Sequence, residues 1–150
     1  MIIQIIPDLF RRYVKGTEKQ AIVQFIEAFL CNMSGPVSDI IAYPHRKVFI
    51  STRVIKHLYD KRTAQEFDFL INNCHLIVKY PDSIYKNKDF KKGRFAFVKE
   101  IRHKKYLCSL EIIEKENVVQ CEIVTCFPTD DAYLENFELL WEWKDGEPSS

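Results

Sequence analysis

The sequence has 150 residues, 47% of them hydrophobic and 13% aromatic, and its formal net charge is +1. This length fits one domain with a sizeable core, and the composition excludes a disordered chain. The near-neutral charge excludes a uniformly basic protein, although the charges are unevenly distributed along the chain.

The N-terminal region begins with a short apolar run that Pro7 and Asp8 interrupt. This run is too short for a signal peptide or a membrane span, so we expect a cytoplasmic protein with no membrane partner. Pro7 and Gly16 suit the start and end of a helix over 7–15. A capping-box pattern at Thr17 and apolar residues at helical spacing predict a second helix over 17–32.

The next segment predicts a short strand at 47–50 followed by two capped helices. Ser51 and Thr52 can cap a helix that runs through Arg62, and Thr63 with Glu66 forms a capping box for a helix that ends near Cys74. The lysine-rich stretch 86–93 predicts an exposed loop.

The C-terminal half changes from helical spacing to a period of two. Three strands are predicted over 94–101, 105–113 and 117–127, with connections short enough for a meander. One or two helical turns over 130–137 precede a strand around 139–143 with one buried face. Helices first and strands later indicate a single α+β domain.

The five cysteines are odd in number and include no CxxC pair, which indicates buried thiols in a reducing compartment. Cys121 and Cys126 lie five residues apart in one predicted strand, so we expect them on opposite faces. Because no histidine and carboxylate ligand cluster is visible either, we expect no metal and no cofactor. Phosphate loops, GxSxG and dinucleotide fingerprints are also missing from the sequence.

Basic residues concentrate in two segments, and acidic residues concentrate at the C-terminus. Segment 44–62 holds six Lys or Arg against one acid, and segment 86–105 holds nine against two. Segment 129–150 holds seven acids against one Lys. Basic surfaces attract polyanions even on a nearly neutral protein, but solvated loops give the same pattern.

The predicted helix over 52–62 contains the strongest candidate for acid–base chemistry. Arg53, His57 and Lys61 follow at i, i+4 and i+8 beside the apolar face, while Lys56 is expected to point toward solvent. Neighbouring cations should lower the pKa of His57, so its neutral imidazole can act as a base near neutral pH. A half-exposed histidine without a function fits the same pattern.

Two strand residues stand out because they share an apolar face with core side chains. Lys99 shares the side of Phe95 and Phe97, and therefore needs a partner or an open cleft. Thr125 shares the side of Cys121 and Ile123, although threonine suits strands in any case.

These segments together resemble a known family. STRVIKHLYDKR is followed by CHLIVKYPDSIYKN, KGRFAFVKEI, IVTCFP and DDAYLENFELLWEW. This series resembles the phage-associated nucleases of the barnase–EndoU–colicin–RelE fold, in which helices precede a four-stranded antiparallel sheet. The resemblance implies a nuclease core over 45–144, a helical extension over 1–44 packed on it, and a disordered tail over 145–150.

The resemblance implies a metal-independent ribonuclease, often a toxin that acts on tRNA or mRNA. Its helix histidine corresponds to His57 and the preceding lysine to Lys56. Its strand cation corresponds to Lys99 or Arg94, and its late-strand hydroxyl to Thr125. No carboxylate in this sequence obviously corresponds to the glutamate base of barnase.

RNA cleavage without a metal requires a base, an acid and cations around the phosphate. His57 suits the proton transfers, and Lys56, Lys99 and Thr125 suit the contacts with phosphate oxygens. The residues expected to bind the RNA backbone are Arg53, Lys61, Lys91, Lys92 and Arg94.

Two other functions fit the same residues. One is a non-catalytic RNA-binding module, and the other is a protein-interaction module that docks a partner such as an antitoxin or immunity protein. A requirement for His57 separates the nuclease from the RNA-binding module, and polyanion binding separates both from the interaction module.

Overall fold

A computed structural model describes residues 5–88, 92–144 and 147–148. The elements in chain order are α1 (Ile5–Leu9), the π-helix η1 (Phe10–Val14), β1 (Glu27–Asn32), α2 (Gly35–Ile40), β2 (Lys47–Ser51), α3 (Thr52–Lys61), α4 (Ala64–Lys79), β3 (Ser83–Lys86), β4 (Phe95–Ile101), β5 (Lys104–Lys115), β6 (Val118–Thr129), α5 (Asp131–Leu134), β7 (Glu138–Lys144) and β8 (Glu147–Pro148). The α+β class is therefore confirmed. No helix of the described residues is long and apolar enough to cross a membrane.

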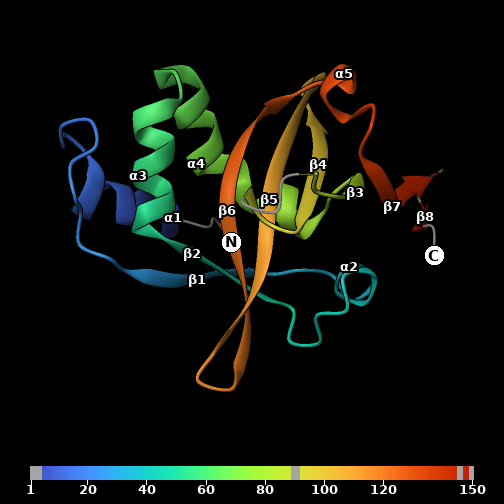
Figure 1. The fold of residues 1–150 in the computed structure, drawn as a ribbon. Helices are drawn as coiled ribbons and strands as arrows, with labels where there is room; N and C mark the ends of the chain where they lie inside the picture. The colour runs from blue at the N-terminus through green and yellow to red at the C-terminus, as the bar shows by residue number, and fades with distance from the viewer. Residues whose placement is uncertain (1–4, 89–91, 145–146, 149–150) are drawn as a thin grey trace.

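The strands form one sheet in the order β1-β2-β6-β5-β4-β3-β7-β8 (Figure 1). The predicted meander of β4, β5 and β6 is confirmed, but the sheet is larger than the four antiparallel strands expected. β2 pairs with β6 in parallel and carries β1 beyond it, while β3 and β7 extend the other side. The short β8 pairs with the end of β7, and residues 145–146 and 149–150 of the predicted tail lie outside the described residues.

The main core lies between α4 and the face of the sheet that it covers. Phe67, Leu70 and Cys74 of α4 pack in one buried cluster with strand residues such as Phe97 and Cys108. The capping box at Thr63 and Glu66 is present as predicted, and α4 continues to Lys79 rather than ending near residue 74. Ser51 caps α3 by accepting a hydrogen bond from the Val54 amide at 3.3 Å.

The helix predicted over 17–32 is wrong. Residues 17–26 are irregular, and 27–32 form β1, which pairs with β2. The Thr17 hydroxyl does not cap a helix, because it donates to the Val14 carbonyl at 2.6 Å and accepts from Lys56 Nζ at 2.8 Å. Tertiary hydrogen bonds have therefore overridden the local helical pattern. The N-terminal region consequently contributes the strand β1 to the sheet, in addition to the two short helices α1 and η1.

The other local predictions are close to the structure. α1 and η1 occupy 5–14 where a helix over 7–15 was predicted, and Gly16 follows with a φ of 81°. α5 is a single turn within 131–134. Only Trp141 of the alternating positions in β7 is buried, since Leu139 and Trp143 are 46% and 48% exposed.

Candidate functional site

A cleft lies along the open part of the β6 edge. In the described residues, β2 pairs with β6 only through Val48 and Phe49, opposite Cys121 and Glu122. The chain then leaves the sheet at Ser51 and enters α3, which runs beside the rest of β6 (Figure 1). The cleft between them has a volume of about 1020 Å³. The turn from strand to helix therefore opens the edge on which the site is built.

Five of the predicted site residues line this one cleft. They come from α3, from the segment before β4 and from β6, and they are Arg53, His57, Lys61, Lys92 and Thr125. The i, i+4, i+8 spacing along α3 explains why Arg53, His57 and Lys61 lie together. The cleft is thus a place where cations, a histidine and a hydroxyl face the same space.

His57 is exposed at the cleft, and its pKa is lowered from 6.5. Partial burial is the largest cause, and the positive charges of Arg62 and Lys61 act in the same direction against a smaller effect of Asp60. The direction predicted from the sequence is confirmed, although the largest cause differs. His57 is therefore mainly neutral near pH 7 and able to accept a proton.

Arg62 is a cleft residue that the stripe on α3 did not reveal. It is the C-cap of α3, and its extended backbone carries the side chain away from the helix toward β6. Its Nε donates to the Cys126 carbonyl at 3.1 Å and its Nη2 donates to the Thr125 hydroxyl at 3.3 Å. The guanidinium also lies 5.5 Å from the centre of the Phe127 ring. In the sequence Arg62 was only one of the six basic residues of segment 44–62, at the end of the predicted helix.

An irregularity in β6 decides which way Thr125 and Cys126 point. Ser109 pairs with Thr125 and Leu110 pairs with Ile123, so Val124 is an extra residue in the register. Cys126 therefore lies on the same face as Cys121 and Ile123, in the main core, and the expected opposition of the two cysteines is wrong. Thr125 lies on the other face, opposite to the side predicted for it.

Acidic residues at the cleft were also missed. Glu27, Glu66 and Glu122 line it together with the cations. Gln120 donates to Glu27 at 2.8 Å and to Glu122 at 2.9 Å, and Lys115 forms ion pairs with both. Burial and the nearby Glu27 carboxylate raise the pKa of Glu122. Glu122 is therefore the carboxyl group at this cleft with an increased tendency to hold a proton.

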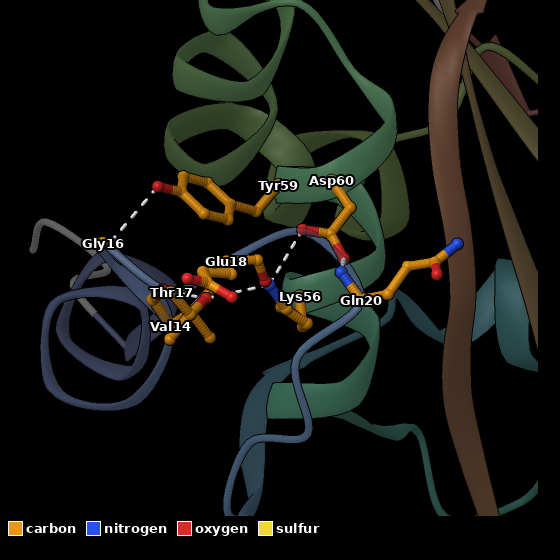
Figure 2. Close-up of polar contacts among 8 residues, drawn as sticks. All are labelled: Val14, Gly16, Thr17, Glu18, Gln20, Lys56, Tyr59 and Asp60. Carbon is orange, nitrogen blue, oxygen red and sulfur yellow. Dashed lines mark hydrogen bonds and ion pairs between the residues drawn. The ribbon is translucent and has the colours of Figure 1, made fainter.

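Lys56 does not point toward solvent, and this prediction is wrong. It is 6% exposed and forms an ion pair with Asp60 at 2.9 Å. Figure 2 shows its Nζ between α3 and the N-terminal segment, where it donates to the Thr17 hydroxyl and the Glu18 carbonyl. Its ammonium group is occupied by these partners, away from the cleft, so its visible role is to attach the N-terminal segment to α3.

The remaining predicted cations lie outside this group. Lys99 donates to the Tyr80 carbonyl at 2.8 Å and pairs with Asp82 at 3.6 Å, which provides the partner that its position required. Arg94 pairs with Glu111 at 3.4 Å. Lys91 lies outside the described residues.

Among the described residues, three cysteines lie close enough together to hold a metal ion. The Sγ atoms of Cys74, Cys108 and Cys126 lie within 4.8 Å of one another, and all three residues are buried. Thiols suit soft metals. The group belongs to the apolar core under α4, so it adds nothing to the chemistry of the cleft.

Comparison with known proteins identifies one family. A family model described as phage-Barnase-EndoU-ColicinE5/D-RelE like nuclease3 matches residues 39–136. Neither the curated proteins nor the solved structures gave a match. The matched residues include α3, β6 and most of the cleft, but neither Phe25 nor Glu27. Because the match covers more than half of the 150 residues, this chain belongs to the phage-Barnase-EndoU-ColicinE5/D-RelE like nuclease3 family.

Proposed function

We propose that this protein is a metal-independent RNA endonuclease that cleaves by attack of the substrate's 2′-hydroxyl on the adjacent phosphate. One observation carries the proposal: His57, with its lowered pKa, lines the same basic cleft as Arg62 and Thr125. Membership of a nuclease family supports the same reaction class.

The reaction requires proton transfers at two oxygens. A base must take the proton of the 2′-hydroxyl, and an acid must protonate the leaving 5′-oxygen. His57 is suited to be one of these groups, since it is neutral and accessible near pH 7. Glu122 is our candidate for the other, because its raised pKa brings its titration closer to neutral pH.

The pentacoordinate phosphate gains negative charge that must be stabilised. Arg62 presents a planar guanidinium at the edge of β6, and this group can donate two hydrogen bonds to a phosphate. Thr125, which Arg62 already contacts, can donate its hydroxyl to a phosphate oxygen. Electrostatic stabilisation of this kind is usually the largest contribution to catalysis.

The other cations of the cleft would hold the RNA backbone. Arg53, Lys61 and Lys92 are exposed and line it from two sides. Lys56 acts in this proposal by fixing α3 and the N-terminal segment rather than by contacting RNA. A tRNA or mRNA substrate, a cytoplasmic site of action, a toxin or phage-defence role and an antitoxin partner remain part of the proposal.

The decisive experiment is cleavage of total tRNA in excess EDTA, with analysis of the product ends. We expect 2′,3′-cyclic phosphate and 5′-hydroxyl ends, and no cleavage where the 2′-hydroxyl is replaced by hydrogen. His57→Ala should lower the rate on the order of 10²-fold or more. His103→Ala is the matched control, because His103 is exposed in the β4–β5 turn. Activity that EDTA abolishes and Mg²⁺ restores would contradict the mechanism, and binding without cleavage would favour a non-catalytic RNA-binding module.

A further inference from the structure

The N-terminal arm, defined as residues 15–26, is firmly attached to α3 at its first end. Lys56 donates to the Thr17 hydroxyl and the Glu18 carbonyl, and Asp60 accepts from the Gln20 amide at 2.9 Å (Figure 2). The Tyr59 hydroxyl accepts from the Gly16 amide at 3.2 Å. An irregular segment is therefore held along one side of the helix that carries His57.

The second end of the arm is fixed by one buried residue at the start of α3. The Thr52 hydroxyl donates to the Gln24 carbonyl at 2.6 Å and accepts from the Ile26 amide at 2.9 Å. The Thr52 amide donates to the Ile26 carbonyl at 2.9 Å, and Thr52 is 0% exposed. The backbone on both sides of Phe25 is consequently held in place.

Phe25 is nevertheless 50% exposed, and it lines the cleft. The guanidinium of Arg53 lies 5.0 Å from the centre of its ring. Arg53 precedes His57 by one helical turn, so the aromatic ring and the proposed acid–base group border the same space. A half-exposed phenylalanine on a fixed backbone gains little from burial, but it offers a preorganised apolar surface.

We propose that Phe25 and Arg53 form a stacking platform that binds an unpaired base of the RNA next to the cleaved phosphate. This inference rests on the proposed function, and it adds a base-binding subsite to it. Single-stranded bases stack on aromatic rings and on arginine planes, which favours RNA as the occupant. Of the two platform residues, Arg53 lies within residues 39–136, which match the family model, and Phe25 lies outside them.

The experiment uses a short single-stranded RNA with 2′-O-methyl sugars, which cannot be cleaved through the 2′-hydroxyl. The fluorescent base 2-aminopurine is placed at successive positions, and its quenching reports stacking. We expect the parent protein to bind this RNA and to quench the fluorescence at one position. Phe25→Ala should lose that quenching and bind about tenfold more weakly, while Phe25→Tyr should retain both.

Two controls make the result specific. Phe29→Ala removes another half-exposed phenylalanine, whose ring packs on Phe49 at 6.0 Å, and it should behave like the parent. An RNA with an abasic site at the quenched position should bind equally to the parent and to Phe25→Ala. Melting temperatures identify any variant that fails to fold. If Phe25→Ala fails to fold, quenching and affinity are compared between Phe25→Tyr and the parent instead.

Unchanged quenching and affinity in Phe25→Ala would overturn the platform. If the parent still cleaves RNA in that case, only this inference fails. If the parent neither binds nor cleaves RNA, the proposed function fails together with it.

Discussion

Arg62 Nη2 donates to the Thr125 hydroxyl at 3.3 Å, although the two residues are 63 positions apart in the sequence. Arg62 follows the last residue of α3. Thr125 lies in the part of β6 beyond the residues that pair with β2. The contact joins the helix that carries His57 to the open sheet edge, and the proposed phosphate site lies at this junction.

Replacing Arg62 tests that site. Arg62→Gln should lower the RNA cleavage rate on the order of 10²-fold, because one group that stabilises the developing charge is lost. Arg62→Lys should recover only part of the rate, since a single ammonium cannot donate in the same planar geometry. Arg46→Gln is the matched control, because Arg46 also donates to a backbone carbonyl, that of Met33 at 3.0 Å. A parent-like rate in Arg62→Gln would contradict the assignment.

The pH dependence of cleavage should report the titration of His57. Since its pKa is lowered from 6.5, a base-catalysed rate should fall only when the pH drops below the ordinary histidine value. The lowered pKa of His57 also contributes to the free energy of unfolding. This contribution is fully present above about pH 6.5 and is lost as the pH falls through the lowered pKa. Single-turnover rates across pH measure this inflection, which should vanish in His57→Gln. An inflection that persists in this variant belongs to another group.

Lys56 should matter for stability rather than for chemistry. Lys56→Met removes the donor for Thr17 and Glu18, at a cost of about 2 kcal/mol, or a fall in Tm of about 4–8 °C. Lys61→Met changes an exposed lysine of the same helix and should stay within about 0.5 kcal/mol of the parent. Thermal unfolding of both variants gives the comparison. A parent-like Tm with abolished cleavage would instead favour a catalytic Lys56.

Asp60, the ion-pair partner of Lys56, predicts that the protein loses stability at low pH. The hydrogen bond from Lys56 lowers the pKa of Asp60 from 3.8. This contribution is therefore fully present above about pH 5 and is lost as the pH falls through the lowered pKa. Comparing Tm between about pH 5 and pH 2 should show a steeper loss in the parent than in Lys56→Met. Equal slopes would show that the pair contributes nothing measurable.

RNA binding should weaken steeply with salt, because cleft cations replace counterions on the phosphates. Each contact with single-stranded RNA contributes a slope of roughly −0.7 in log affinity against log salt. Lys92→Met should reduce the slope by about that amount, whereas Lys99→Met should not, because Lys99 is bound to Tyr80 and Asp82. Fluorescence anisotropy over a salt series measures the slopes. A flat response in the parent would favour the protein-interaction module.

The local elements of this protein were largely predictable because their signals are local. Three signals depend only on neighbouring residues: the capping box at Thr63 and Glu66, the short strand predicted at 47–50, and the period of two beyond Gly93. Each corresponds to an observed element. The helical stripe likewise placed Arg53, His57 and Lys61 on one side of α3, and they line one cleft.

The sequence by itself thus determined the α+β class, the meander and the basic helix with its histidine. Only the tertiary structure decided that 27–32 is a strand, that Lys56 is buried and that Arg62, Glu122 and Phe25 join the cleft. Capping and periodicity act between residues a few positions apart, so they can be read along the chain. The pairing of β1 with β2, the extra residue Val124 and the contact of Arg62 with Thr125 depend on segments that meet only after folding, and no local pattern encodes them.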